Sequence, residues 1–308
     1  MDGELQILDT RNGKAAPISI TVPDDGLARR PSRISAANNI ESYELSPKGE
    51  RALFSARGDI FTAPIEKGPT RNLTHSSGAH DKWPSWSPDG SQIAFISDMS
   101  GEEELYVVPQ DGSKPPTQIT TGGSAMRYQP DWSADGKYIA FSDKDGKVFV
   151  VTLADKKMTE IVDAPRNQIR DYVWSPSGSY LAFSCRVRTE TASAQIHIWS
   201  AADGKVHRVT DQMFNAQNPA WDPTGSYLYF ISTREFAPQI STVEFNYATN
   251  RDSYIYAMAL RKDVKHPFPP ESDEVAMTRP KDESGAGRTK EGRRGRKTAT
   301  ATAKAYGD

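Results

Sequence analysis

One twelve-residue pattern occurs five times along this chain, and this repeat constrains the fold more than any other feature of the sequence. Each copy has a short apolar segment, a tight turn and a second apolar segment. The copies are YELSPKGERALF, PSWSPDGSQIAF, PDWSADGKYIAF, YVWSPSGSYLAF and PAWDPTGSYLYF, which begin at Tyr43, Pro84, Pro130, Tyr172 and Pro219. The residue that opens the turn recurs after 41, 46, 42 and 47 residues, a period typical of repeat architectures.

The turn has the same chemistry in every copy. Ser or Asp opens it, because the side chain can accept hydrogen bonds from backbone N–H groups ahead, and Pro usually follows and presets φ. The fourth turn position is always glycine, and the next strand always ends in phenylalanine. These positions are Gly49, Gly90, Gly136, Gly178 and Gly225, and Phe54, Phe95, Phe141, Phe183 and Phe230. We expect the tryptophans before the turns to pack as wedges between repeats.

Two further strands complete each repeat. The third is DIFTAPI, ELYVVPQ, KVFVVTL, QIHIWSA or SYIYAMA, and the fourth is RNLTH, TQITT, MTEIV or HRVTD. Four antiparallel strands per repeat, without helical periodicity, predict an all-β protein, a β-propeller of four-stranded blades. A β-sandwich would not repeat its sequence in this way.

The two ends of the chain depart from the repeat. Residues 3–22 carry only the last two strands of a blade, and the fifth blade has an insertion from about Thr233 to Asp252. The prediction is five blades and an N-terminal half-blade, about six in total, in a propeller domain of residues 1–268. The half-blade either closes a ring or remains from a truncated blade.

From Pro269 the composition becomes rich in proline, glycine and charge, so we expect residues 269–308 to form a disordered charged tail. Within it, RRGRK from Arg293 is a basic run that could contact an anionic surface, although a solvated linker is the simpler interpretation.

Charge and composition exclude several classes of protein. The 308 residues carry a net charge of −2, so no whole-chain field attracts nucleic acid. Cys185 is the only cysteine, which excludes an intrachain disulfide. No apolar run is long enough for a membrane span, and the N-terminus has no basic, apolar leader. These features favour a cytoplasmic location, and a periplasmic one stays open if the true N-terminus is missing.

The sequence shows no catalytic motif, and we predict no catalytic residue, no cofactor and no metal. His75 and His80 could meet Asp81 at a metal ion, but exposed loop residues are the simpler interpretation. His197 alternates with isoleucines and is interpreted as a partly exposed strand residue. The turn aspartates Asp89 and Asp135 fit turn geometry better than calcium binding, because other copies replace them. Cys185 is expected to be buried.

The best candidates for binding precede the innermost strands, where a propeller faces its central channel. They are polar and charged, and as a set they could contact an extended peptide; a water-filled polar channel wall is the alternative. The candidates are Asp81, Lys82, Arg127, Tyr128, Arg170, Asp171 and Asn218, with Glu41 and Gln217 beside them.

The pattern W-S-P-D-G-x-x-I-A-F resembles the WD40-like repeats called PD40, known from TolB and from tricorn-type proteases. The tricorn resemblance is closer and runs from about residue 3 to Glu274. It is carried by ARGDIFTAPIEKG from Ala56, by LYVVPQDGS, and by LRKD followed by PPESDE. Together these segments resemble the second propeller of a tricorn-like peptidase of the S41 type.

The resemblance implies a function. Tricorn-like proteases are serine peptidases with two propellers before a PDZ domain and a catalytic domain, and their propellers are regarded as filters that guide peptides. No residue here corresponds to the catalytic serine or histidine. The first hypothesis is therefore a non-catalytic propeller segment that works with peptides and with PDZ and catalytic regions outside this chain. The alternative is a stand-alone TolB-like scaffold for a protein partner, and an enzyme using the propeller itself ranks last.

Overall fold

The computed structural model describes residues 5–21, 23, 35–76, 78–165, 168–186, 193–234, 238–240, 247–249 and 253–269. The chain divides into two compact units, Met1–Val264 and Lys265–Asp308. All the strands among the described residues belong to the first unit, and the predicted tail lies outside the described residues from position 270 onward. Within the described ranges, no helix is long and apolar enough to cross a membrane.

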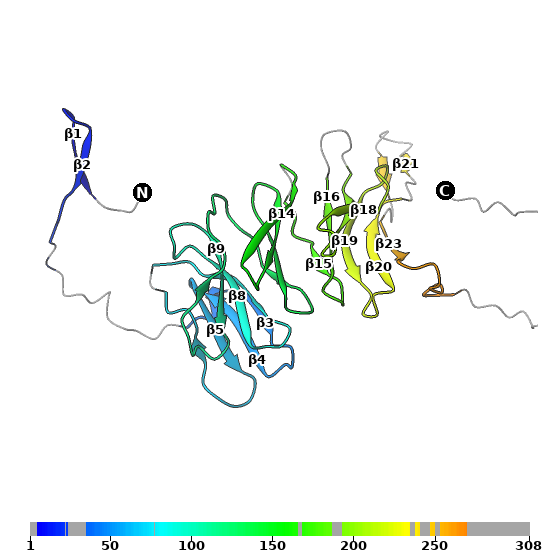
Figure 1. The fold of residues 1–308 in the computed structure, drawn as a ribbon, viewed down its shortest axis with the longest axis horizontal. Coiled ribbons are helices and arrows are strands. Elements are labelled where there is room, and N and C mark those ends of the chain that lie inside the picture. The colour runs from blue at the N-terminus through cyan, green and yellow to red at the C-terminus, as the bar shows by residue number, and fades with distance from the viewer. Residues whose placement is uncertain are drawn as a thin grey trace, which may run out of the picture. The chain divides into compact units, whose positions relative to one another are not determined.

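Four sheets have four antiparallel strands each, joined in chain order as simple meanders (Figure 1). We number these sheets as blades. Blade 1 follows a short 3₁₀ turn, Ala37–Asn39, and contains β3 (Ile40–Leu45), β4 (Arg51–Ala56), β5 (Asp59–Pro64) and β6 (Arg71–Asn72). Blade 2 contains β7 (Lys82–Trp86), β8 (Gln92–Ser97), β9 (Glu104–Pro109) and β10 (Thr117–Gln118).

The next two blades repeat this order. Blade 3 contains β11 (Asp131–Trp132), β12 (Tyr138–Ser142), β13 (Lys147–Thr152) and β14 (Lys157–Asp163). Blade 4 contains β15 (Val173–Trp174), β16 (Tyr180–Cys185), β17 (Gln195–Ser200) and β18 (Val206–Arg208).

Blade 5 has three described strands, β19 (Ala216–Trp221), β20 (Tyr227–Ser232) and β23 (Tyr254–Ala259). A separate pair, β21 (Pro238–Ile240) and β22 (Tyr247–Thr249), lies within the predicted insertion. At the other end, β1 (Gln6–Asp9) and β2 (Lys14–Pro17) form the two-stranded hairpin expected of a half-blade. The prediction of an all-β propeller with four-stranded antiparallel blades is confirmed, and the number of blades agrees approximately with the predicted count.

Each blade turn is closed by the bonds that its sequence predicts. In blade 1 the Ser46 hydroxyl oxygen accepts the backbone N–H groups of Glu50 at 3.0 Å and Arg51 at 3.1 Å. Gly49 donates its N–H to the Ser46 carbonyl at 2.7 Å and has a φ of +68°. Glycine adopts this left-handed conformation without steric cost, which explains its place in all five turns.

The core is divided among the interfaces between consecutive blades, and each apolar cluster draws on two neighbouring blades. The turn tryptophans join these interfaces as wedges: Trp86, Trp132 and Trp174 are buried. Three indole N–H groups also bond to the inner strand of the preceding blade. The pairs are Trp132 Nε1 to the Ser85 carbonyl at 3.2 Å, Trp174 Nε1 to the Asp131 carbonyl at 3.0 Å and Trp221 Nε1 to the Val173 carbonyl at 3.0 Å.

The second strand of every blade continues one or two residues beyond the phenylalanine at which it was predicted to end. In blades 2 to 5 this phenylalanine packs beside an aromatic ring on the third strand. Four such pairs are stacked, namely Phe95–Tyr106, Phe141–Phe149, Phe183–His197 and Phe230–Tyr256, with centroids 5.2 to 5.9 Å apart. His197 thus fills an aromatic core position and is only 6% exposed. Our interpretation of it as a partly exposed strand residue is wrong, whereas the prediction that Cys185 is buried is confirmed.

Candidate functional site at the inner strands

Lys82 and Arg127, two of the predicted candidates, converge on one acidic side chain between blades 2 and 3. The Lys82 ammonium group pairs with Glu103 Oε1, and the backbone N–H of Arg127 donates to Glu103 Oε2 at 2.6 Å. Lys82 begins β7 and Glu103 directly precedes β9, so the contact joins the first and third strands of blade 2 to the segment that enters blade 3. Both charged side chains are largely removed from solvent.

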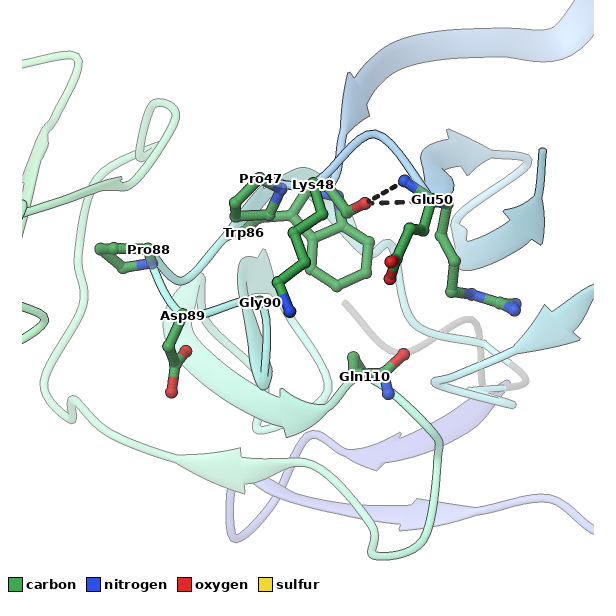
Figure 2. A pocket seen from close by; sticks show the side chains of 10 residues that line it. Pro47, Lys48, Glu50, Trp86, Pro88, Asp89, Gly90 and Gln110 are labelled. Carbon is green, nitrogen blue, oxygen red and sulfur yellow. Dashed lines mark hydrogen bonds between the residues drawn. The ribbon is translucent and has the colours of Figure 1, made fainter.

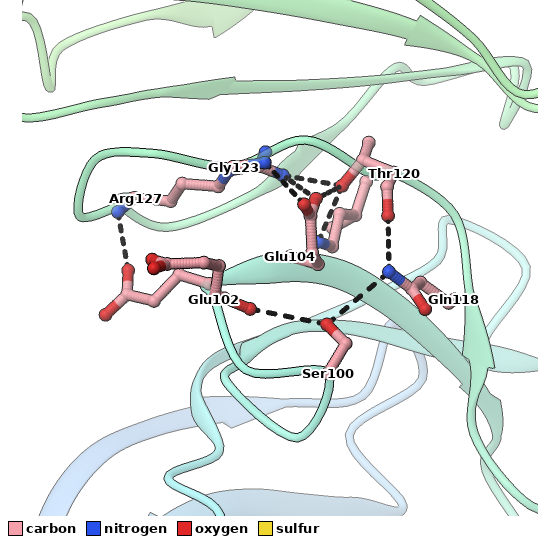
Figure 3. Close-up of polar contacts among 9 residues, drawn as sticks. Ser100, Glu102, Glu104, Gln118, Thr120, Gly123 and Arg127 are labelled. Carbon is pink, nitrogen blue, oxygen red and sulfur yellow. Dashed lines mark hydrogen bonds and ion pairs between the residues drawn. The ribbon is translucent and has the colours of Figure 1, made fainter. Parts of the chain in front are cut away.

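The Arg127 side chain belongs to a second, fully buried part of this network. Its Nη1 lies 2.8 Å from Glu104 Oε2, and the two side chains are 5% and 3% exposed. Glu104 also accepts the Thr120 hydroxyl at 2.6 Å and the Gly123 N–H at 2.6 Å (Figure 3). Burial lowers the pKa of Arg127, and the Glu104 charge opposes that effect. A buried ion pair is stable only when its remaining polar groups are hydrogen-bonded, and the Thr120 and Gly123 bonds meet this condition for Glu104. The ion pair therefore fixes the position of blade 3 against blade 2.

Glu103, Glu104 and Thr120 were not among the predicted site residues. A signal for Glu104 and Thr120 exists in the repeat, because a threonine after the fourth strand bonds to the start of the third strand in other blades. Thr74 accepts the Ile60 N–H at 3.2 Å, and Thr210 accepts the Ile196 N–H at 2.9 Å. The recurring L-T, I-T and V-T pairs of the fourth strands mark this position.

The remaining candidates link blade 3 to blade 4 and blade 4 to blade 5. The Arg170 guanidinium lies 3.9 Å from the centroid of the buried Tyr128 ring, a cation–π contact. Asp171 accepts the Ser184 N–H at 3.1 Å and the Asn218 N–H at 2.9 Å. These four candidates thus form packing contacts or hydrogen bonds between consecutive blades.

The exposure of the seven candidates differs. Asp81, Arg127 and Tyr128 are buried; Lys82 and Asp171 are half-buried; Arg170 and Asn218 are exposed. Asp81 bonds to the Ser76 hydroxyl, and its N–H donates to the Gly58 carbonyl at 3.0 Å. Arg170 and Asn218 are thus the candidates whose side chains solvent reaches most freely.

Two acidic residues of the inner strands were missed by the sequence prediction. Glu44 on β3 accepts the Trp86 N–H at 3.0 Å, and Asp131 begins β11 two blades along. Burial and the Glu44 charge raise the pKa of Asp131 to about 7. Burial likewise raises the pKa of Glu44. Glu44, Ser85 and Asp131 hold the same repeat position, directly before the leucine or tryptophan that precedes the turn, and this spacing was the available signal.

The suggested histidine metal site does not assemble. His80 Nε2 lies 3.6 Å from Glu41 Oε2, whereas Asp81 bonds to Ser76. His75 has a left-handed φ of 47° and donates its N–H to the Asn72 side chain at 3.0 Å. Over the described ranges, no group of three or more His, Cys, Asp or Glu side chains is arranged to hold a metal ion.

Repeating four-stranded blades, interface cores and indole bonds between neighbours define a β-propeller domain built from WD40-like repeats. A sequence profile of the family described as the tricorn protease second beta propeller domain matches residues 40–302. The chain belongs to this family. The matched segment extends beyond Glu274, where the resemblance recognised in the sequence ended.

Curated relatives agree with this assignment. The chain is 24% identical over 276 residues to tricorn protease homolog 1 of Streptomyces coelicolor, covering 87% of this chain and 26% of the relative. It is 23% identical over 261 residues to the tricorn protease homolog of Saccharolobus solfataricus, covering 84% and 23%. The chain therefore spans about a quarter of the length of these relatives.

Among solved structures, the crystal structure of the tricorn protease superposes with a TM-score of 0.68 at 18% identity. The superposition covers 86% of this chain and 26% of the tricorn chain. At this identity the likeness concerns the fold, and it supports the blade architecture described above.

Proposed function

We propose that this propeller contacts peptides at the polar residues before its inner strands and guides them toward a catalytic region outside this chain. The observation that carries the proposal is the match over residues 40–302 to a protease propeller family, in a chain without a catalytic motif. The function is a non-catalytic one: a filter or scaffold within a tricorn-like serine protease.

The exposed candidates suit an extended peptide. Arg170 presents a guanidinium fixed above the Tyr128 ring, which can pair with a carboxylate or a peptide carbonyl. Asn218 has an amide that can both donate and accept, and its backbone is anchored by Asp171. Tyr128 holds Arg170 and Asp171 holds Asn218 in place, whereas Asp81, Lys82 and Arg127 form contacts at the preceding blades.

The proposed partners follow from the same assignment. PDZ and catalytic regions of a tricorn-like protease would receive the peptide, and we propose that this takes place in the cytoplasm. The propeller domain would comprise residues 1–268, with 269–308 as a separate charged tail.

Photo-crosslinking tests the proposal. A ten-residue peptide carrying benzoylphenylalanine should crosslink near Arg170 and Asn218 of the full chain, as mapped by mass spectrometry. Arg170→Ala should reduce the yield several-fold, and so should Asn218→Gly, which keeps the left-handed φ of 55°. Arg208→Ala is the matched control, because Arg208 lies on β18, the outermost strand of the same blade. Crosslinks that both site variants leave unchanged would refute the contact surface.

Peptide hydrolysis tests the non-catalytic part separately. The purified chain should not cleave fluorogenic peptides above the buffer rate. Turnover that a point mutation within residues 1–270 abolishes would show that the propeller itself is an enzyme.

A further inference from the structure

Clefts recur where the turns of consecutive blades meet. The first lies between the turns of blades 1 and 2 and measures about 370 Å³ (Figure 2). A second, of about 410 Å³, lies between the turns of blades 2 and 3, and a third, of about 450 Å³, between those of blades 4 and 5. Because each of the three clefts is lined by the turns of two consecutive blades, a cleft with a binding role can be identified by the side chains that the other two lack.

The first cleft has cationic side chains at turn positions where the other copies are neutral or acidic. Lys48 lies in the turn and Arg51 begins β4, and both line the cleft together with Glu50, Trp86 and Gln110. The residues equivalent to Lys48 are Asp89, Asp135, Ser177 and Thr224, and those equivalent to Arg51 are Gln92, Tyr138, Tyr180 and Tyr227. Figure 2 shows Lys48, Glu50 and Gln110 around one opening beside the Trp86 ring.

Two residues that line this cleft each carry a buried N–H donor without a hydrogen-bond partner among the described residues. One donor is Nε1 of Trp86, a residue that is 5% exposed, and the other is Nε of Arg51. The tryptophans of the other two clefts differ, since Trp132 and Trp221 donate to carbonyls of the preceding blade. A buried donor without a partner costs free energy, so an acceptor supplied from outside would be stabilised here.

The local charge favours an anionic acceptor. Arg51 is fixed by its Nη2 atom, which donates to Thr62 Oγ1 at 2.9 Å and to the Thr62 and Pro69 carbonyls at 3.2 and 3.1 Å. Burial and the neighbouring charge of Arg71 lower the pKa of Arg51, and an anion nearby would oppose both effects by favouring the charged guanidinium.

The two acidic residues of the cleft differ in how they are engaged. The Asp89 carboxylate is hydrogen-bonded within its own turn. It accepts the Ser87 hydroxyl at 2.6 Å and both the backbone N–H and the hydroxyl of Ser91. Glu50 is the acidic group left to oppose an incoming anion.

We propose that this cleft binds the carboxylate group of a peptide, with Trp86 Nε1, Arg51 Nε and the Lys48 ammonium as donors. That the carboxylate belongs to a peptide rests on the proposed function; the anion preference rests on the cleft alone. A carboxylate presents two acceptor oxygens and can engage several donors at once. The carboxylate can come from a peptide C-terminus or from an acidic side chain.

Indole NMR signals provide the direct test. The ¹⁵N–¹H indole resonance of Trp86 in the full chain is assigned by its loss in Trp86→Phe. Acetyl-trialanine with a free C-terminus should shift this resonance downfield in a saturable way, while its C-terminal amide should not. Acetyl-Ala-Glu-Ala-amide shows whether a side-chain carboxylate is accepted as well. Equal shifts with acid and amide, or no shift with any carboxylate probe, would overturn the proposal.

Matched variants locate the binding. Trp86→Phe should weaken acid binding about tenfold, as expected for one bond to a charged group, measured by chemical shifts of neighbouring amides. Trp132→Phe, at the equivalent buried position, should leave binding unchanged. Lys48→Met should weaken binding, and Glu50→Gln should strengthen it, because it removes the opposing charge. A Glu50→Gln variant that binds no better than the unmodified chain would contradict the electrostatic assignment.

The stability of the same variants provides an independent check that needs no ligand. Trp132→Phe loses its bond to the Ser85 carbonyl, whereas Trp86→Phe loses none, so the Trp132 variant should unfold at a lower temperature. A Trp86→Phe variant that is at least as unstable would show that the Trp86 indole N–H is already bonded.

The two sets of experiments distinguish the two proposals. If small acids bind in the cleft but peptide crosslinking does not depend on Arg170 and Asn218, carboxylate binding in the cleft is supported and the proposed function is refuted. If crosslinking depends on Arg170 and Asn218 but small acids do not bind, only the proposal for the cleft is refuted.

Discussion

Asp131 shows how one inner-strand residue makes the stability of the propeller depend on pH. Burial and Glu44 raise its pKa to about 7, compared with an ordinary value of 3.8. Between about pH 4 and pH 7 the folded chain therefore holds a proton that the unfolded chain has released. The free energy of unfolding contributed by this group decreases as pH rises through that window.

Asp131→Asn should remove this contribution, because asparagine cannot lose a proton and keeps the backbone carbonyl that accepts Trp174 Nε1. We expect the variant to be more stable than the unmodified chain at pH 8 and to lose most of that advantage at pH 4, in urea unfolding monitored by fluorescence. Asp145→Asn, at an exposed position, is the control. Equal stability of the Asp131 variant and the unmodified chain at pH 8 would contradict the assignment.

The buried Arg127–Glu104 ion pair allows a second prediction, which concerns the free energy of unfolding. Glu104→Met leaves a guanidinium buried without its carboxylate, which should lower the free energy of unfolding by about 3 kcal/mol. Adding Arg127→Met should recover part of that loss, because an apolar pair often replaces a buried ion pair at little cost. Urea titrations of the two single variants and the double variant measure the coupling. Additive losses would mean that the pair does not act as a unit.

At the scale of the element, the turns differ in how closely they approach their neighbours. A Cβ at Gly178 would lie 2.7 Å from Asp135 Oδ1 in the preceding turn, whereas a Cβ at Gly136 meets no atom within 4 Å. Both glycines have a left-handed φ, +73° and +69°. Gly136→Ala should therefore cost only the conformational penalty, about 1 kcal/mol. Gly178→Ala should cost measurably more in thermal unfolding, and equal losses would refute the close approach of the two turns.

The repeat made the strands and turns of each blade predictable, because a glycine in the turn and a phenylalanine near the end of the second strand recur at fixed positions. The orientation of the residues entering the inner strands was less predictable. The pairing register shifts between Lys82 and Ser85 and between Gln217 and Ala220, and Trp83 and Asn218 have left-handed φ values of 55°. Such bulges interrupt the alternation of faces on which a sequence prediction depends. Lys82 and Arg127 accordingly meet Glu103 between blades, a contact between segments 21 and 24 residues apart.

At the scale of the whole molecule, burial increases from the end blades to the interior ones. The second residue of the third strand is 0% exposed in blades 1 to 4, at Ile60, Leu105, Val148 and Ile196, and 77% exposed at Ile255 of blade 5. On the opposite face, Tyr43 and Leu45 of blade 1 are 80% and 60% exposed. A blade is covered on both faces only by its two neighbours, so the faces of the end blades carry the apolar groups that interior blades bury.

The extent of the domain can be tested because two observations place its end differently. The family match runs to residue 302, whereas the compact unit ends at Val264. We expect a chain of residues 1–268 to keep the circular dichroism spectrum and the melting temperature of the full chain, because all described strands end by Ala259. A chain of residues 1–302 is the matched control. If the shorter chain melts several degrees lower while the control does not, residues 269–302 pack on the propeller and the proposed boundary at 268 is wrong.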